Sequence, residues 1–224
     1  NWPATGRGLV IANHSGGLGA DAAMILTSLL LNDEAPRLGQ GMAEYFLTRS
    51  PFARPALRKL GHLTGLPEHA EQLLNDERLL TVFPEGARGA GKLYKDRYKL
   101  VRFGTGFMRL ALKMGAPIIP CAFIGGEESF PQLFHIKWLA KLVNGPFVPV
   151  APQLILFPLP VACQVYYGPP MHFEGDGSEP DHVIQQYVDD VRHAMERLIS
   201  TGLDARPRSF MFERMPDPKK EGRR

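Results

Sequence analysis

The stretch RLLTVFPEGARG, residues 78–89, joins a short apolar run to a turn that carries a carboxylate and a guanidinium. The apolar part, from Arg78 to Phe83, predicts a buried strand that the following Pro-Glu-Gly sequence ends. The two glycines let the backbone bend sharply and present amide groups to an anion. The planar fork of Arg88 suits a phosphate, and Glu85 can bind a substrate hydroxyl or orient Arg88. We therefore predict that Glu85, Gly86 and Arg88 bind substrate; the alternative is a surface ion pair that contributes little.

A second polar turn follows the apolar run Gly8–Ala12 and reads Asn13-His14-Ser15-Gly16-Gly17. Imidazole titrates near neutral pH, so His14 can accept a proton from an attacking hydroxyl group. Asp21 is the next acidic residue along the chain, and a folded glycine loop would bring it to the far ring nitrogen. We predict His14 and Asp21 as catalytic residues and Asn13 as a substrate-binding residue. A surface histidine and a helix-capping aspartate would be the simpler interpretation of this pair alone, but the stretch 78–89 favours the catalytic one.

The two turns belong to a chain in which apolar runs alternate with amphipathic segments. Strands are predicted at residues 8–12, 78–83 and 118–124 and within 37–47, and helices at 21–31, 67–75, around 103–114 and at 180–200, the last ended by Gly202. Such alternation is typical of an α/β fold, here a layered single domain with a central, mostly parallel sheet flanked by helices. This domain is expected to occupy residues 1–204.

Charge is concentrated at the C-terminal end of the chain. The net charge is +3 over 224 residues, and residues 205–224 contain seven Lys or Arg against three Asp or Glu. This segment is predicted to be a disordered basic tail, which anionic lipid would attract. The remaining chain is close to neutral, which argues against nucleic acid as a partner. A basic run at residues 88–109 is interpreted either as a solvated face or as contacts to phosphate.

The cysteines and the start of the chain bear on its environment. Cys121 and Cys163 lie in apolar, strand-like runs without metal-ligand spacing, and two cysteines make no disulfide framework. We expect both to be reduced core residues, and we expect no metal. The sequence starts Asn-Trp-Pro, so we expect an upstream segment to be missing, and such a segment could carry a membrane anchor.

Residues 142–173 contain no Asp, Glu, Lys or Arg and are long enough for a membrane-spanning helix. Seven prolines in this segment would each remove a helical hydrogen bond, so a spanning helix is not expected. Residues 161–167 are predicted to form a buried strand. The apolar residues around Trp138 fit two structures equally: a loop packed on its own core, or a surface that dips into a bilayer with Lys137 and Lys141 at the headgroups.

At these residues the chain resembles the glycerolipid (lysophospholipid) acyltransferase family, also called the glycerol-3-phosphate acyltransferase superfamily. The first block of the family is Asn-His followed by Asp. The third block, Phe-Pro-Glu-Gly-Thr-Arg, matches residues 83–88 with Ala87 in place of Thr. The fourth, an apolar strand, matches APIIPCA at residues 116–122. Order and spacing agree over roughly residues 5–200, and residues 102–107 are most similar to the monoacylglycerol acyltransferase-like branch.

The resemblance implies an O-acyltransferase of lipid metabolism and phospholipid biosynthesis. It would move a fatty acyl chain from acyl-CoA or acyl-carrier protein, a substrate rather than a bound cofactor, to a hydroxyl of a lysophospholipid or related glycerolipid. His14 would be the general base and Asp21 its orienting partner. Glu85, Gly86 and Arg88 would form the acceptor-binding turn, and no covalent acyl-enzyme is expected.

The implied location is the cytoplasmic face of a membrane, with the chain as a peripheral or monotopic protein and lipid as its partner. A non-catalytic membrane lipid-binding module on the same fold is the alternative function. A hydrolase is a third hypothesis, but the chain has no Gly-x-Ser-x-Gly motif, and Ser15 beside His14 is a poor nucleophile candidate.

Three departures from the family pattern bear on the site. Six residues rather than four separate His14 from Asp21. The second block reads KLGHLTG at residues 59–65, without its phosphate-binding arginine. The lysine often found before the later helix corresponds to about Gly104. The two missing basic positions make lysophosphatidic acid a weaker candidate acceptor and a neutral or larger acceptor a stronger one.

Overall fold

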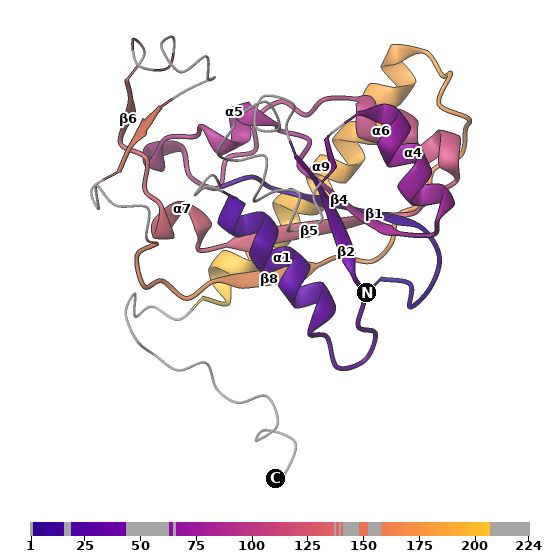
Figure 1. Cartoon of the computed structure of the whole chain (residues 1–224). Coiled ribbons are helices and arrows are strands. Elements are labelled where there is room, and N and C mark those ends of the chain that lie inside the picture. Colours follow the sequence, from indigo (N-terminus) through magenta and orange to yellow (C-terminus); the bar gives the residue numbers. More distant parts are fainter. Residues whose placement is uncertain are drawn as a thin grey trace.

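A six-stranded sheet forms the centre of the computed structural model, with its strands in the order β3-β2-β4-β1-β5-β8 (Figure 1). The strands are β1 Gly8–Ala12, β2 Gly39–Ala43, β3 Leu63–Thr64, β4 Leu79–Val82, β5 Ile118–Ile124 and β8 Gln164–Tyr167. All neighbouring strands pair in parallel except β8, which runs antiparallel to β5 at one edge. The structure describes residues 2–15, 19–43, 63–64, 66–136, 138, 140, 148–151 and 158–206.

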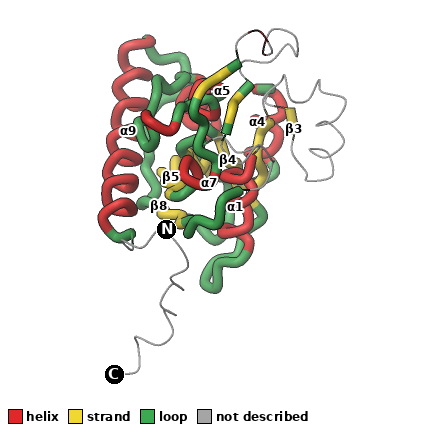
Figure 2. The backbone as a smooth tube through the Cα atoms, turned by 90° about the vertical axis from the view of Figure 1, so that its left-hand side faces the viewer, coloured by secondary structure: helices red, strands yellow, loops and turns green. Residues whose placement is uncertain are grey.

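Helices cover both faces of this sheet. They are α1 Ala20–Leu30, α4 Pro67–Asn75, α5 Ala87–Ala90, α6 Gly106–Met114, α7 Gly126–Ser129 and α9 Asp181–Asp204, with a 3₁₀ helix η2 at Tyr94–Asp96. Helix α1 packs on one face, and α4, α6 and α9 pack on the other (Figure 1 and Figure 2). A separate hairpin pairs β6 Phe134–His135 with β7 Pro149–Val150. The layered α/β fold with a mostly parallel sheet, which the sequence predicts, is confirmed.

Strand β1 lies at the centre of the protein because β4 and β5 flank it and helices cover both of its faces. Leu9 and Ile11 belong to the core under α4, α6 and α9, whereas Val10 and Ala12 belong to the core under α1. All four side chains are fully buried. A continuous apolar run, rather than an alternating one, is what such a central strand requires.

The predicted elements are found with small shifts at their ends. β1 and β5 have the predicted bounds, β4 lies within residues 78–83, and β2 occupies 39–43 of the predicted 37–47. The remainder of that prediction, residues 44–47, lies outside the described residues. Helix α4 has the predicted bounds and starts with Pro67, whose missing N–H has no partner to lose in a first turn.

Two helix ends differ from the prediction. Phe103 is buried with the predicted apolar stripe, but α6 begins only at Gly106. Helix α9 continues through Gly202 to Asp204, although the sequence predicts that Gly202 ends it. A Cβ atom on Gly202 would lie 2.8 Å from Ile124 Cγ1 and 2.8 Å from the Tyr166 ring. This glycine therefore permits a close crossing of the helix over β5 and β8.

The apolar segment before α9 is only partly described. β8 lies within the predicted strand 161–167, and its side chains are half-buried because it is an edge strand. Near the hairpin, Leu133 is 50% exposed, Phe134 55% and Trp138 69%. Lys137, Lys141 and residues 142–147 and 152–157 lie outside the described residues. Among the residues that are described, no helix is long and apolar enough to cross a membrane.

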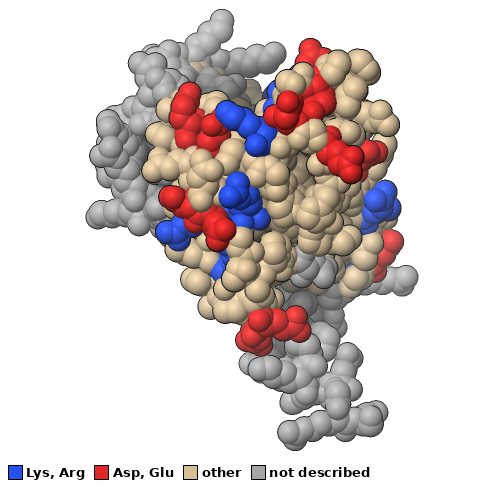
Figure 3. Space-filling model, turned by 90° about the vertical axis from the view of Figure 1, so that its right-hand side faces the viewer, with Lys and Arg blue, Asp and Glu red and all other residues tan. Residues whose placement is uncertain are grey.

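Charged side chains of both signs lie next to one another on the face shown in Figure 3. Most basic side chains of the run 88–109 lie at the solvent-exposed surface. Two of them form ion pairs there, Lys99 with Asp96 and Arg109 with Asp181. Arg206, the first basic residue of the predicted tail, binds Glu128 with an Nη1–Oε1 distance of 2.6 Å. Residues 207–224 lie outside the described residues, so the disorder of the tail stays a prediction there.

Cys121 is buried on β5, and Cys163 is half-buried before β8.

Gly202→Ala tests the close crossing of α9 over the sheet. In a compatible helix position, glycine-to-alanine stabilises a protein by about 0.4–1 kcal/mol. Here the new methyl group would meet Ile124 and Tyr166, so we expect destabilisation by roughly 1–3 kcal/mol. Urea unfolding measures the difference, with exposed Ser200→Ala as a control that should stay within about 0.5 kcal/mol. A Gly202→Ala protein more stable than the wild type would contradict the packing.

Candidate active site

The two predicted turns lie side by side because β1 and β4 are neighbours in the sheet. Their parallel register pairs Gly8 with Leu79 and Ile11 with Val82, so both strands end at the same edge. Residues 13–15 follow β1 there, and the turn at residues 84–86 follows β4. In open parallel sheets this carboxyl edge is the usual place for a ligand site.

Asp21 reaches the histidine despite the longer spacing. His14 Nδ1 lies 2.5 Å from Asp21 Oδ2. The carboxylate is fully buried in the first turn of α1, where Oδ2 also accepts the backbone N–H of Ser15 at 2.9 Å and Oδ1 accepts that of Ala22 at 2.8 Å. These N–H groups and the positive end of the helix stabilise its negative charge. The structure therefore brings together the two residues predicted as catalytic.

The surroundings of His14 favour its charged form. Its side chain is 17% exposed, and its ring stacks on Phe83 with centroids 4.5 Å apart. Burial lowers the pKa of His14, but the charge and hydrogen bond of Asp21 and the charge of Glu85 together raise it above the ordinary 6.5. Because Nδ1 faces Asp21, Nε2 is the ring nitrogen that can exchange a proton with a bound molecule. This is the arrangement of a general base with an orienting carboxylate.

Glu85 points into the protein. Its Oε1 accepts the backbone N–H of His14 at 3.0 Å, and its Oε2 accepts that of Val101 at 2.8 Å. The residue is 1% exposed. The carboxylate thus joins the histidine turn to the loop before α6. The contact of Glu85 with substrate stays a prediction.

The glycines of the second turn allow close packing rather than an anion nest. Gly86 has φ 57° and ψ −150°, a conformation that glycine adopts readily. Its N–H donates to Phe83 O at 3.0 Å, and that of Gly89 donates to Gly86 O at 2.9 Å, so both amides are used within the turn. A Cβ atom on Gly89 would lie 2.5 Å from Glu85 Cβ and 3.0 Å from His14 Cβ. Without one, α5 packs directly against the histidine.

Arg88 faces outward from the same turn. It is exposed, and its Nη2 donates to the carbonyl of Arg102 at 3.2 Å. Glu85 accepts backbone N–H groups instead of orienting this guanidinium. Of the residues predicted to bind substrate, Arg88 is thus the charged one that remains accessible.

Asn13 extends the sheet beyond β1. Its Nδ2 donates to Phe123 O at 3.0 Å, and Phe123 N–H donates to its Oδ1 at 2.7 Å. The side chain is fully buried. Asn13 therefore fixes the end of β1 on β5, and its contact with substrate stays a prediction.

An ionic cluster beneath the turns is missed by the sequence interpretation. Lys92 Nζ lies 3.5 Å from Glu85 Oε2 and 3.2 Å from Glu127 Oε1, and none of these side chains is more than 3% exposed. Lys92 belongs to the basic run that the sequence assigns to solvent or phosphate. A signal for Glu127 does exist, because it follows β5 closely, as Glu85 follows β4, at the same edge of the sheet.

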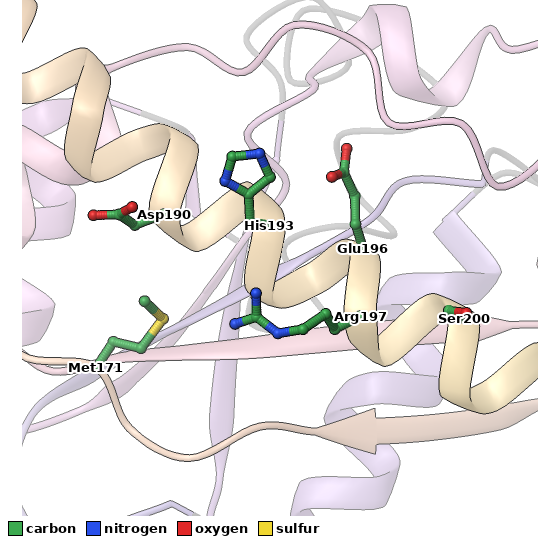
Figure 4. Close-up of a pocket in the computed structure, with 6 residues that line it drawn as sticks. All are labelled: Met171, Asp190, His193, Glu196, Arg197 and Ser200. Carbon is green, nitrogen blue, oxygen red and sulfur yellow. The ribbon is translucent and has the colours of Figure 1, made fainter.

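Three other features could indicate a site: the Ser15 hydroxyl, a cluster of metal-ligating side chains and a pocket beside α9. The Ser15 hydroxyl is buried and donates to Asp21 Oδ2 at 3.3 Å, which does not present it as a nucleophile. The described part of the chain holds no group of three or more His, Cys, Asp or Glu side chains suited to a metal ion. Figure 4 shows a pocket beside α9 that includes none of the predicted site residues; it is lined by Met171, Asp190, His193, Glu196, Arg197 and Ser200.

Comparison with known proteins finds relatives over most of the chain. A family model described as Acyltransferase matches residues 1–124. An uncharacterised protein of Mycobacterium leprae is 35% identical over 222 residues, which cover 94% of this chain and 60% of that protein. An uncharacterised protein of Mycobacterium tuberculosis strain H37Rv is 36% identical over 223 residues, covering 94% and 62%. The chain thus spans about three fifths of the length of these relatives.

Two further matches are more distant. A chicken protein described as a DGAT1/2-independent enzyme synthesizing storage lipids is 26% identical over 161 residues, 71% of this chain and 46% of that protein. Among solved structures, the 1-acyl-sn-glycerophosphate acyltransferase PlsC of Thermotoga maritima matches with a TM-score of 0.50 and 18% identity, covering 86% of this chain and 66% of that one. At this identity the match is evidence for the fold.

Asp21→Asn tests the electrostatic link to His14. The change removes the charge and the acceptor that raise the pKa of His14, so that pKa should fall towards or below 6.5. Titration of the His14 ring by NMR measures the shift. Ser15→Ala keeps the Asp21 carboxylate and serves as the control with a wild-type-like pKa. An unchanged pKa in the Asp21→Asn protein would show that the carboxylate is not the partner of the ring.

The same pair determines how stability varies with pH. Because the pKa of His14 is raised on folding, its protonation stabilises the fold fully below about pH 6.5, and this contribution is lost as the pH rises through the folded-state pKa. Asp21→Asn should therefore destabilise most at low pH and flatten this decline. Urea unfolding between about pH 5 and 8 measures both proteins. Parallel curves for the two proteins would contradict the linkage.

Proposed function

The chain belongs to the acyltransferase family, and we propose that it transfers a fatty acyl chain to a hydroxyl group of a glycerolipid. The proposed donor is acyl-CoA or acyl-carrier protein, and the proposed acceptor is a lysophospholipid or a related glycerolipid. The contact of 2.5 Å between His14 Nδ1 and Asp21 Oδ2 carries the proposal. It gives the histidine a fixed orientation and a counter-charge for the imidazolium that a general base becomes.

Acyl transfer requires one proton to move from the acceptor to the leaving group. In the proposed step the acceptor oxygen attacks the thioester carbonyl carbon while its proton passes to His14 Nε2. A C–O bond forms and the C–S bond breaks, and the departing thiolate takes the proton back from the imidazolium. Asp21 remains ionised throughout and stabilises the charged ring. The step balances without a covalent acyl-enzyme.

The acceptor is proposed to bind at the rim formed by Arg88, and to be neutral or larger than lysophosphatidic acid. Arg88 is exposed there, with its Nη2 on the Arg102 carbonyl. At Gly104, where family members often carry a lysine, a Cβ atom would meet only Pro84 O, at 3.8 Å. The space that a lysine side chain would occupy at this position is therefore open, and Gly104 supplies no positive charge there. The chicken relative is described as an enzyme synthesizing storage lipids, which supports including neutral acceptors in any assay.

We further propose that the protein works at the cytoplasmic face of a membrane, as a peripheral or monotopic protein. Leu133, Phe134 and Trp138, here called the hairpin patch, are exposed apolar side chains in or near β6. Gln132 ties this patch to the end of α5, because its Nε2 donates to Ala90 O at 2.6 Å. Figure 1 shows the β6 hairpin projecting near α5. A patch that enters the headgroup region would bring a lipid acceptor to the edge of the site.

A non-catalytic lipid-binding module is the second candidate. It is favoured by the inward orientation of Asn13 and Glu85, which hold backbone groups and would be needed for the fold alone. Both candidates predict binding to vesicles, but only the first predicts turnover of an acyl donor. Incubation with a labelled acyl-CoA and a mixed pool of phosphorylated and neutral lipids separates them and identifies the acceptor.

His14→Ala tests the proposed base in that assay. Losing general-base catalysis should slow acyl transfer by about 10²–10⁴-fold, and the wild-type rate should rise with pH through the raised pKa of His14. Circular dichroism verifies that the variant is folded. His193→Ala removes an exposed histidine of α9 and should keep the wild-type rate. Unreduced acyl transfer by the His14→Ala protein would contradict the role of His14 as general base. If the wild type binds vesicles but turns over no acyl donor, the non-catalytic lipid-binding module is favoured.

Phe134→Ser combined with Trp138→Ser tests the hairpin patch. Each ring should contribute about 1.5 kcal/mol or more to burial in a bilayer interface, so the loss of both rings should weaken vesicle binding by about a hundredfold or more. Co-sedimentation with phosphatidylglycerol vesicles measures the change. Leu31→Ser is the matched control, because Leu31 is 72% exposed at the far end of α1. Equal binding of the double variant and the wild type would rule out this surface.

A further inference from the structure

Lys92 is a buried lysine whose surroundings explain why its charge is tolerated. Its side chain is 3% exposed, and lysine is seldom buried unless its charge is compensated. Its Nζ lies within ion-pair distance of Glu85 and Glu127, yet hydrogen-bond geometry is met with neither. The ammonium group therefore acts on its neighbours mainly through its charge, instead of as a directed donor.

The carboxylate that this charge compensates supports the proposed base. Glu85 accepts the N–H groups of His14 and Val101 with its two oxygens, which makes it the link between two loops of the site. A fully buried carboxylate is costly unless a cation lies nearby. Lys92 supplies that cation from below, and the turn after α5 places it there, because Lys92 N–H donates to Gly89 O at 3.1 Å.

The neighbouring acids differ in the cations that compensate them. Glu128 has its own cation, since Arg206 Nη1 lies 2.6 Å from its Oε1, and the Tyr98 hydroxyl bonds its other oxygen. Glu127 shares Lys92 with Glu85 at 3.2 Å, and its Oε1 also accepts the N–H of Tyr98 at 3.2 Å. Within this described cluster, Lys92 is the cation within ion-pair distance of the carboxylate that holds the histidine.

We propose that Lys92 is a positioning residue for the acyl transfer: through the Glu85 carboxylate it holds the backbone of His14, and hence the base, in its working place. This inference rests on the proposed function for its kinetic consequence. Its structural part, a coupling from Lys92 through Glu85 to the His14 amide, is independent of any activity.

The kinetic test uses a double-variant cycle. Lys92→Met keeps the length of the side chain and removes the charge, and it should lower kcat at least tenfold with KM changed less than twofold. Glu85→Gln should also lower kcat. The double variant should be no slower than the slower single variant, because the lysine acts through that carboxylate. Lys113→Met is the matched control; Lys113 lies on the surface, paired with Glu71, and its loss should leave kcat unchanged. Losses that multiply in the double variant would overturn the proposal.

The structural test follows backbone amides by NMR and hydrogen exchange. In Lys92→Met the amides of His14 and Val101 should shift and exchange faster, whereas the Ser15 amide, which is bound to Asp21, should keep its wild-type exchange rate. If these amides respond to Lys92→Met but the wild-type protein shows no acyltransferase activity, the coupling from Lys92 to His14 is supported and only the proposed function is rejected. Unchanged His14 and Val101 amides in folded Lys92→Met would overturn the coupling.

A second variant covers the case in which Lys92→Met does not fold. Glu85→Gln combined with Lys92→Met leaves one buried carboxylate, Glu127, without its cation, whereas Lys92→Met alone leaves two. The double variant should therefore unfold at a higher temperature than the single variant. A higher unfolding temperature would support the pairing of Glu85 with Lys92. No gain over Lys92→Met would overturn it.

Discussion

One buried carboxylate holds together the three segments that make the site. Glu85 belongs to the turn after β4, and it accepts N–H groups from His14 after β1 and from Val101 before α6. Hydrogen bonds to a buried carboxylate are short and strong, so these segments cannot move independently. Asp21 fixes the direction of the imidazole ring, but that direction is useful only because Glu85 first fixes the backbone that carries it.

The helices and the strands are predictable from sequence because their signals are local. Apolar runs bounded by turn residues give β1 and β5 their bounds, and Pro67 marks the start of α4. The adjacency of β1 and β4 is not local, since it depends on which distant strands pair. Gly202 leads to a wrong prediction of the helix end for the same reason. A glycine is needed there because the helix crosses close to β5 and β8, and the sequence around Gly202 does not reveal that contact.

The orientation of polar residues is the other quantity that sequence does not provide. Asn13, Glu85 and Arg88 all follow strand ends, yet the first two bind backbone groups and the third faces solvent. A motif therefore identifies which residues matter more readily than what each one touches. The spacing of His14 and Asp21 shows the reverse case: a continuous helix would separate them by about 10 Å, but α1 begins only at Ala20, so the aspartate turns back to the ring.

The strand order also determines when the site can form as the chain leaves the ribosome. β1 is synthesised early, but its partners β4 and β5 are separated from it by long stretches of chain, and α9 packs over β5 later still. Pairings between distant segments form late in folding. The histidine turn therefore gains the partners of its backbone and of Asn13 only when Glu85 and Phe123 have been synthesised. A nascent chain that ends before β5 would carry both motifs without the strand that holds Asn13.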